Sequence, residues 1–341
     1  MGNHPLKMRI GVIGAGAWGT TLANLLAEKG YGVALWVYEA NLVERLIKER
    51  ENAPYLPGVR LSERVKPTPS IEEAVKGKDV IIMVTPSHAL REVAERAVPF
   101  LKGDVRIVIA TKGLEVESLK RMSEVMSEVL PSSLVGNLAV LSGPSFAKEV
   151  SAKVPTAITV ASANGRVARE IQALLSTPHL RVYTSSDVIG VEIGGAVKNV
   201  IAIAVGAAVG LGLGYNSQAA LITRGLTEMT RLAVKLGANP LTLAGLSGLG
   251  DLVLTATGGL SRNRGLGIEL GRGRKLEVIL RETRTVAEGV RTAKAVYQLA
   301  QKLGIEMPIS EQVYRMLYEN LPPSEALSAL MSRELREELE F

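Results

Sequence analysis

The chain has 341 residues, of which 47% are hydrophobic and 4% aromatic, and it carries a formal net charge of +6 and no cysteine. This length suggests two domains with a large buried core, and the lack of cysteine excludes disulfides, thiolate nucleophiles and cysteine-based metal sites. The modest basic excess fits phosphorylated ligands, whereas the few aromatic residues and the absence of a dense Lys/Arg block argue against nucleic-acid binding. With only three histidines, we expect no metal site.

An apolar run at residues 9–13 leads into the spacing Gly14-x-Gly16-x-x-Gly19, and residues 20–28 then have helical composition. Strand, tight turn and helix in this order predict a dinucleotide site. Gly14 permits the turn, Gly16 lets the backbone approach a pyrophosphate, and Gly19 lets the helix pack closely on the strand. The phosphates would lie at the helix N-terminus. A tight strand–helix turn without a ligand is the alternative.

A second strand is expected over residues 33–37, and Glu39 follows it. An acid about 20 residues beyond the third glycine suits a hydrogen bond to the ribose 2′-hydroxyl of NAD and repels the additional phosphate of NADP. We therefore expect NAD to be favoured over NADP, with Arg45 as a nearby cation able to offset this preference.

Strands and helices alternate through the first half of the chain. This alternation predicts an α/β fold with a Rossmann-type, doubly wound, mostly parallel sheet, in which ligands bind beyond the carboxyl ends of the strands. The further expected strands are residues 80–84, 105–110, 138–141, 156–161 and 181–183. The segments that follow three of them, residues 85–88, 111–113 and 142–146, are candidate contact sites.

Helical patterning replaces this alternation near Asp187, which predicts an all-α C-terminal domain. We place a dinucleotide-binding domain at residues 1–189, with residues 1–7 as a loose extension, and a helical substrate domain at residues 190–341. The helices expected there cover residues 191–210, 217–236, 262–270, 286–303 and 310–319, with another starting at residue 239.

The most apolar stretch, residues 200–213, is too short to span a bilayer, which takes about 20 residues. A buried helix is the better interpretation. No secretory signal is visible, because the first apolar run is short and belongs to the strand before the glycine turn. We therefore expect a soluble cytoplasmic protein without membrane insertion.

Lys198 is the strongest candidate for acid–base chemistry, because it stands in an otherwise apolar helix. Burial would lower its pKa towards the working pH. A lysine whose ammonium group reaches the surface along its stem is the alternative. Asp251, in the glycine-rich turn at residues 245–252, is a candidate to orient this lysine or to cap a helix.

A polar, basic turn at residues 258–265 opens a helix. Arg262 and the backbone N–H groups there would hold a phosphate, and Asn263 a hydroxyl; an ordinary surface loop is the alternative. Lys112, at a strand end, either contacts substrate or cofactor or is a surface lysine. His88 is the one histidine near the expected sheet end, and we assign it to the border of the cofactor site.

Together these segments resemble the bacterial type of NAD(P)-dependent glycerol-3-phosphate dehydrogenase over about residues 8–330. The resemblance implies reversible hydride transfer between the nicotinamide and C2 of dihydroxyacetone phosphate, giving sn-glycerol 3-phosphate for glycerophospholipid synthesis. A homodimer is also implied. The matching segments, in order, are residues 14–20, 86–88, 110–115, 142–149, 194–202, 219–225, 248–252 and 261–264.

The resemblance further implies roles for individual residues. Lys198 would be the proton donor and acceptor, supported by Asp251 and Asn199. Lys112 would help to polarise the carbonyl and would touch the cofactor. The implied substrate contacts are Lys112, Gly143, Ser145, Lys198, Asp251, Thr255, Ser261, Arg262 and Asn263. The implied cofactor contacts are Gly14, Gly16, Ala17, Trp18, Gly19, Tyr38, Glu39, Pro86, His88, Lys112, Ala147, Arg262, Val286 and Glu288.

Two other functions remain open from the residues. One is a 3-hydroxyacid or 6-phosphogluconate-type dehydrogenase of the same architecture, which also places a lysine and an asparagine on a buried helix. The segments 142–145 and 261–264 argue against it. The other is a dinucleotide sensor without catalysis, against which the presence of Lys112, Lys198 and Asp251 argues.

Overall fold

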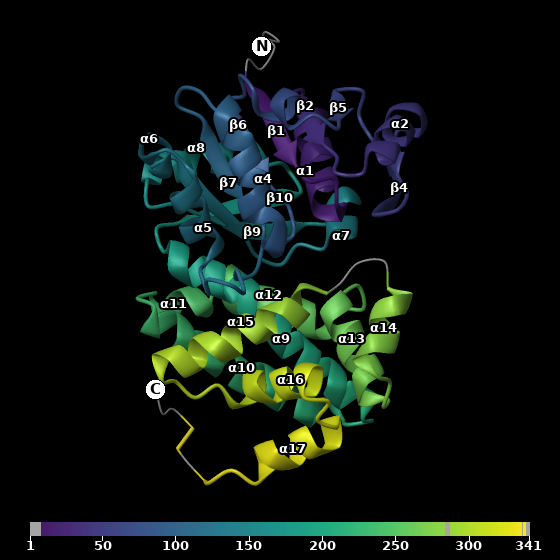
Figure 1. Ribbon diagram of the computed structural model, residues 1–341, viewed down its shortest axis with the longest axis vertical. Coiled ribbons are helices and arrows are strands. Elements are labelled where there is room, and N and C mark those ends of the chain that lie inside the picture. The colour runs from purple at the N-terminus through teal and green to yellow at the C-terminus, as the bar shows by residue number, and fades with distance from the viewer. Residues whose placement is uncertain (1–7, 284–286, 336, 339–341) are drawn as a thin grey trace. The chain divides into compact units, whose positions relative to one another are not determined.

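The computed structural model describes residues 8–283, 287–335 and 337–338 (Figure 1). By its internal contacts the chain divides into two compact units. One comprises Met1–Thr111 and Met122–Val188, and the other comprises Lys112–Arg121 and Ile189–Phe341. The division at residue 189 that we expected makes no allowance for Lys112–Arg121, which lies between two strands in the sequence but belongs to the second unit.

The first unit is built on an eight-stranded sheet with the spatial order β10-β9-β8-β7-β6-β1-β2-β5. Neighbouring strands are parallel except β8 and β9, which are antiparallel. The strand order reverses between β1 and β6, which is where doubly wound folds bind their ligands. The predicted Rossmann-type, mostly parallel sheet is therefore confirmed. Its strands are β1 (Arg9–Ile13), β2 (Gly32–Trp36), β5 (Val65–Thr68), β6 (Val80–Met83), β7 (Arg106–Ile109), β8 (Leu138–Ser142), β9 (Thr156–Ala161) and β10 (Leu180–Ser185).

Helices and one small hairpin complete this unit (Figure 1). The hairpin pairs β3 (Glu51–Asn52) with β4 (Leu56–Arg60) in antiparallel fashion. It and the edge strand β5 lie outside our expectations. The helical segments are α1 (Ala17–Glu28), α2 (Ala40–Glu49), α3 (Ile71–Val75), η1 (Ser87–Ala89), α4 (Leu90–Ala97), η2 (Val98–Phe100), α5 (Met122–Val129), α6 (Ser132–Val135), α7 (Ala147–Ser151) and α8 (Gly165–Leu175).

The second unit is helical, which confirms the predicted all-α C-terminal half. The one β-pairing among its described residues is an isolated antiparallel bridge between Leu114 and Arg121. The glycine-rich stretch that we expected to be a turn is a π-helical turn, η3 (Leu246–Gly250), that continues into α12 (Asp251–Thr257). The other helices are α9 (Val188–Gly210), α10 (Tyr215–Lys235), α11 (Pro240–Leu243), α13 (Arg262–Gly271), α14 (Leu276–Glu282), α15 (Glu288–Leu303), α16 (Pro308–Tyr318) and α17 (Pro323–Met331).

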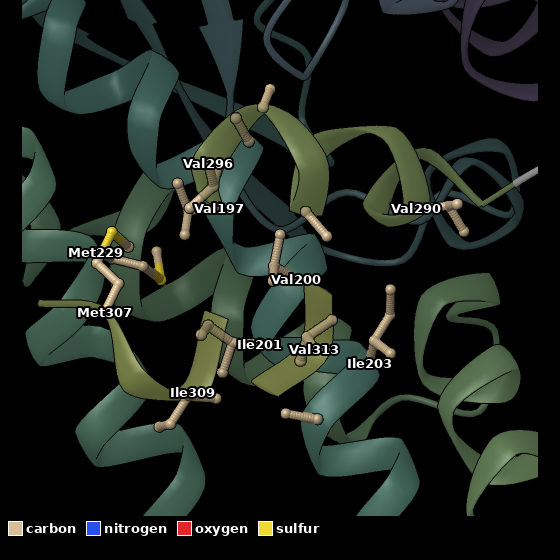
Figure 2. Packing of buried hydrophobic residues seen from close by; sticks show 14 of the residues in the cluster. Val197, Val200, Ile201, Ile203, Met229, Val290, Val296, Met307, Ile309 and Val313 are labelled. Atoms are coloured by element: carbon tan, nitrogen blue, oxygen red, sulfur yellow. The ribbon is translucent and has the colours of Figure 1, made fainter. Parts of the chain in front are cut away.

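Helix α9 is the centre of the second unit. Its side chains Val197, Val200 and Ile201 pack among apolar residues of several other helices, including Val296 and Val313 (Figure 2). With 23 residues the helix is long enough to cross a membrane, so our expectation that the apolar stretch is too short was wrong. However, 89% of its most apolar window is buried inside the unit, as in the core helix of a globular domain.

Glycines allow α9 and α13 to pack backbone against backbone. A Cβ atom at Gly206 of α9 would lie 2.2 Å from the carbonyl oxygen of Arg264, and one at Gly267 of α13 would lie 2.1 Å from that of Ile203. No side chain fits at such distances. This close contact fixes the start of α13 relative to the helix that carries Lys198.

Candidate active site

The glycine turn after β1 has the geometry that a bound dinucleotide requires. Gly14 adopts φ +118°, and a Cβ atom there would lie 2.8 Å from the carbonyl oxygen of Val84. A Cβ atom at Gly19 would lie 1.9 Å from the carbonyl oxygen of Gly14. With any side chain at this position, the helix could not pack as closely on the turn as it does. Beside Gly16, the N-cap of α1, no atom lies within 4 Å of the missing side chain. This open space at a helix N-terminus suits a pyrophosphate.

A buried asparagine from the hairpin supports this turn. Asn52 Nδ2 donates to the backbone oxygen of Ala15 at 2.8 Å and to Thr20 Oγ1 at 2.7 Å. Asn52 is fully buried, so these bonds replace those that its side-chain NH2 group would make with water. Our sequence reasoning missed this residue, and a single asparagine outside any motif gives no local signal of such a role.

The acid that we expected at the end of the second strand is held by a tyrosine. Glu39 is half-buried at the N-cap position of α2, and Tyr55 Oη donates to its Oε1 at 2.5 Å. Arg45, the cation considered for the 2′-phosphate of NADP, forms an ion pair with Glu49 at 3.3 Å. Tyr38 is 75% exposed beside Glu39. The second strand therefore ends in a fixed carboxylate.

The other expected cofactor residues of this unit lie near strand ends or helix starts. Pro86 and His88 are exposed, before and within η1, which follows β6. Ala17 and Ala147 are the first residues of α1 and α7. Trp18 is partly buried against the apolar core.

The loop after β8 contains the two expected substrate residues of the first unit. Gly143 adopts φ +131°, and a Cβ atom there would lie 2.9 Å from Ile158 Cα, so only glycine fits. Ser145 Oγ donates to the backbone oxygen of Gly143 at 2.9 Å. These contacts hold the loop in a tight conformation.

In the second unit, a buried carboxylate lies between two lysines. Asp251 is 1% exposed. Its Oδ2 accepts a hydrogen bond from Lys112 Nζ at 2.7 Å, and its Oδ1 accepts one from Lys198 Nζ. Lys198 Nζ also donates to Thr255 Oγ1 at 2.8 Å, and that hydroxyl donates to the backbone oxygen of Asp251 at 2.6 Å. The structure thus brings together four of the expected site residues.

Each alternative considered for Lys198 and Asp251 is disfavoured by this geometry. The side chain of Lys198 is 8% exposed, so its ammonium group does not reach the surface. Gly250 is the N-cap of α12, and Asp251 is its first helical residue, with a carboxylate that faces the lysines.

Burial and neighbouring charge bring the pKa of Lys198 close to neutral pH. Burial lowers its pKa to about 7, an effect that Asp251 opposes and that the nearby ammonium group of Lys112 reinforces. Burial alone would raise the pKa of Asp251, but Lys112 and Lys198 outweigh it and hold that pKa below its usual value. Asp251 therefore stays ionised while Lys198 exchanges a proton near neutral pH.

Asn199 has a different partner from the one we expected. Its Oδ1 accepts from Asn263 Nδ2 at 2.9 Å, and Asn263 Oδ1 in turn accepts from the backbone N–H of Gly289 at 2.9 Å. The amide of Asn199 is thus directed towards α13, and no described hydrogen bond joins it to Lys198. It links the lysine-bearing helix to the starts of α13 and α15.

The basic turn begins α13 and has the form of a phosphate site. Ser261 is the N-cap, and its Oγ accepts from the N–H of Arg264 at 3.2 Å. The first N–H groups of a helix have no intrahelical partners and attract anions. Arg262 is exposed there, whereas Asn263 is buried. Glu288 is half-buried in the first turn of α15, and Val286 lies outside the described residues.

The two units define a class of protein. The first has a dinucleotide-type glycine turn and an acid after the second strand. The second has a buried lysine with a shifted pKa and a basic helix start. A Rossmann unit followed by a helical unit of this kind is typical of nicotinamide-dependent dehydrogenases with a separate substrate domain.

Comparison with known proteins identifies the family. The models described as NAD-dependent glycerol-3-phosphate dehydrogenase N-terminus and C-terminus match residues 9–168 and 187–328. A relative from Geobacter sulfurreducens, named glycerol-3-phosphate dehydrogenase [NAD(P)+], is 54% identical over 333 residues, which is 98% of this chain and 99% of the relative. One of the same name from Syntrophobacter fumaroxidans is 54% identical over 332 residues, covering 97% and 98%.

A solved structure agrees with these relatives. The crystal structure of glycerol-3-phosphate dehydrogenase from Coxiella burnetii is similar with a TM-score of 0.92 and 42% identity, covering 96% of this chain and 100% of that one. The chain belongs to the NAD-dependent glycerol-3-phosphate dehydrogenase family, which confirms the resemblance and makes it an NAD(P)-dependent oxidoreductase. The hydroxyacid dehydrogenase and sensor alternatives are not favoured.

Proposed function

We propose that this chain catalyses the reversible reduction of dihydroxyacetone phosphate to sn-glycerol 3-phosphate, a precursor of glycerophospholipids, with NAD(H) or NADP(H). The observation that supports this most is the cluster Lys112–Asp251–Lys198. It provides a titrating proton donor and a second cation in one hydrogen-bonded group, in the unit that also carries a phosphate-type helix start.

The dinucleotide-binding domain, which we propose at residues 1–189 without Lys112–Arg121, fits the cofactor. The open space beside Gly16 accommodates the pyrophosphate at the N-terminus of α1, and Glu39 accepts a hydrogen bond from a ribose hydroxyl. When bound, the nicotinamide supplies or accepts the hydride. We propose residues 190–341, together with Lys112–Arg121, as the substrate domain.

The proton is handled by Lys198. In the reduction direction its ammonium group donates a proton to the ketone oxygen, and in the oxidation direction its neutral amine removes a proton from the hydroxyl. Asp251 keeps the ammonium group of Lys112 in place at 2.7 Å, and that fixed charge stabilises the negative charge that develops on the oxygen. Thr255 orients the amine through its hydroxyl at 2.8 Å.

The phosphate is the group of this small substrate that can form the strongest interactions with the protein. Ser261, Arg262 and Asn263 stand at the start of α13, where a dianion gains from N–H groups and a guanidinium. A rigid anchor reduces the entropy lost on reaching the reactive geometry. For Gly143, Ser145 and the remaining expected contacts, the family resemblance alone supports a binding role.

We propose that NAD is preferred over NADP. The carboxylate of Glu39 is fixed by Tyr55, and Arg45 is engaged by Glu49, so the strand end offers an acid and not a cation to the ribose. Kinetics with NADH and NADPH under the same conditions test this preference. A marked preference for NADPH would contradict it. We also propose a cytoplasmic homodimer on the family resemblance, and sedimentation of the purified protein tests its oligomeric state.

The function is tested by following NADH absorbance with three carbonyl substrates: dihydroxyacetone phosphate, unphosphorylated dihydroxyacetone and a simple 3-oxoacid. We expect rapid oxidation of NADH with the phosphorylated ketone alone. Faster turnover of the 3-oxoacid would favour the hydroxyacid dehydrogenase, and no turnover with cofactor still bound would favour a sensor.

A further inference from the structure

The segment Lys112–Arg121 forms a small hairpin in the second unit. Leu114 and Arg121 face each other in an antiparallel bridge, and Glu115 N donates to the backbone oxygen of Lys120 at 3.0 Å. Lys112 stands at the start of one leg, directly before Gly113, and Arg121 ends the other. Gly113 adopts φ +141°, a conformation that a glycine reaches freely, so the backbone at Lys112 is not stiffened by its own sequence.

Apolar contacts hold the middle of this hairpin. Leu114 is 1% exposed and belongs to the apolar cluster around α9, and Val116 and Leu119 pack against the same cluster. Leu119 adopts φ +62°, which is uncommon for a residue with a side chain and persists where surrounding contacts fix it. The hairpin therefore belongs to the helical core, although in the sequence it lies between two segments of the first unit.

A buried ion pair holds the far leg. Arg121 Nη1 lies 2.6 Å from Glu192 Oε2, and the two side chains are 14% and 5% exposed. Glu192 belongs to α9, the helix that carries Lys198. Helix α9 therefore affects both lysines that bind Asp251. It carries Lys198, which donates to Oδ1, and through Glu192 it binds the hairpin that carries Lys112, which donates to Oδ2.

We infer that Arg121 and Glu192 are positioning residues that hold Lys112 on Asp251 by tying its hairpin to α9. The inference rests on the proposed function, because it gives Lys112 a part in catalysis. A lysine followed by a glycine at a strand end would lose rotamer and backbone freedom on reaching Asp251. The Arg121–Glu192 ion pair and the buried Leu114 fix the hairpin on α9, and so restrict Lys112 before substrate binds.

Loss of the ion pair has a consequence that general destabilisation does not have. The charge of Lys112 helps to lower the pKa of Lys198, while Asp251 raises it and Thr255 contributes an uncharged hydroxyl. If the hairpin releases Lys112, the pKa of Lys198 rises. The pH at which the reduction rate falls then moves upwards, in the same direction as in Lys112→Met, where the charge is removed outright.

The test compares Arg121→Met, Arg121→Lys and Glu192→Gln with Lys112→Met in the full-length enzyme. We expect Arg121→Met to lower kcat by about tenfold or more, with the binding of NADH unchanged and the pH profile moved upwards as in Lys112→Met. Arg121→Lys keeps the positive charge and should restore part of both effects. Arg315→Met, which removes an arginine from an exposed ion pair with Glu319, is the matched control and should leave both unchanged.

Hydrogen exchange gives a readout that does not depend on activity. Amides of Lys112–Arg121 should exchange faster in Arg121→Met than in the wild type, with the rest of α9 unchanged. A wild-type kcat in Arg121→Met, or a reduced kcat with an unmoved pH profile, would overturn the inference. If Arg121→Met does not fold, Arg121→Lys and Glu192→Gln decide it by the same measurements.

Different results would contradict the proposed function and this inference. A wild-type enzyme that does not oxidise NADH with dihydroxyacetone phosphate removes the proposed function, whatever the hairpin does. An active wild type with full kcat in Lys112→Met overturns the inference alone, because Lys112 then needs no positioning.

Discussion

At the residue scale, Lys198 is surrounded by groups that each have a separate effect on its amine. Burial favours the neutral form, Asp251 favours the charged form, and Lys112 adds a second positive charge nearby. Lys198 is recognisable in the sequence as a candidate for acid–base chemistry because a lysine in an apolar helix requires a partner; the helical periodicity alone gives no such signal. The family resemblance implies that Asn199 supports Lys198, but its side chain accepts from Asn263, and the sequence alone does not indicate which way a side chain points.

Replacing Lys198 with methionine keeps most of the length of the side chain and removes the titrating amine. We expect Lys198→Met to lower kcat by about 10²-fold to 10⁴-fold, the range that a general acid contributes. NADH titrations should give the wild-type dissociation constant. Lys235→Met, at an exposed lysine of α10, is the control. If Lys198→Met kept most of its activity, the proton-transfer role would belong to another group.

The pH dependence of the two directions should be opposite. The pKa of Lys198 is lowered to about 7, so its donating ammonium form prevails below that pH and its accepting amine form above it. Values of kcat/KM for ketone reduction should fall as the pH rises through about 7, and those for alcohol oxidation should rise over the same range. Profiles that move in the same direction would show that Lys198 does not control the rate.

Arg262 gives a test of the phosphate anchor. Arg262→Ala removes an exposed guanidinium from the start of α13. We expect KM for dihydroxyacetone phosphate to rise by about 10-fold to 100-fold, as a lost charge-assisted hydrogen bond implies. Any residual turnover of unphosphorylated dihydroxyacetone should not change. An unchanged KM for the phosphorylated ketone would remove Arg262 from the phosphate site.

At the element scale, β6 shows why a strand inside the sheet can be predicted from its sequence. The four residues of β6 are all buried, as expected for a strand with helices on both faces, so that strand reads as an unbroken apolar run. The missed edge strand β5 has the sequence Val-Lys-Pro-Thr, in which the lysine and the proline mask any apolar pattern. Helix α12 was missed because η3, with its two glycines, precedes it.

The close contact between α9 and α13 predicts that one added methyl group destabilises the protein. In Gly267→Ala the added Cβ would lie 2.1 Å from the carbonyl oxygen of Ile203, so the helices must separate. We expect a loss of about 1–3 kcal/mol in the free energy of unfolding, typical of overpacking, together with a higher KM for the phosphorylated substrate. Gly265→Ala adds the same group to the same helix, where no atom lies within 4 Å, and should be neutral or slightly stabilising. Equal stability of the two variants would contradict this account of the contact.

At the scale of the whole molecule, sequence order and structural grouping differ at one place. Composition and element pattern predicted a sheet half and a helical half, but they assigned Lys112–Arg121 to the half in which it occurs in the sequence. Its membership of the helical unit depends on long-range contacts of Leu114 and Arg121, which no local pattern records. The same holds for Tyr55 and Asn52, whose partners are distant in the sequence.

A fragment comprising residues 189–341 should therefore be an incomplete domain. It lacks Leu114, whose burial contributes about 2 kcal/mol, and the two cations that face Asp251 and Glu192 from the hairpin. We expect it to melt at a lower temperature than the same fragment with residues 112–121 attached through a flexible linker. Circular dichroism measures both. A linked segment carrying Leu114→Ser is the control, and equal melting temperatures in all three fragments would show that the hairpin adds nothing to the helical core.

The placement of one carboxylate between two ammonium groups also determines the electrostatics of a full turnover. The cluster of Lys112, Asp251 and Lys198 carries one positive charge in excess while Lys198 is protonated. Hydride addition turns the ketone into an alkoxide with one negative charge, and passage of the proton then leaves the alcohol and the cluster both neutral. The positive charge lost by the cluster would then be carried by the oxidised nicotinamide, so the total charge of protein, cofactor and substrate would not change. Before the next reduction Lys198 would have to regain a proton from solvent, so reduction would consume one proton per turnover and oxidation would release one.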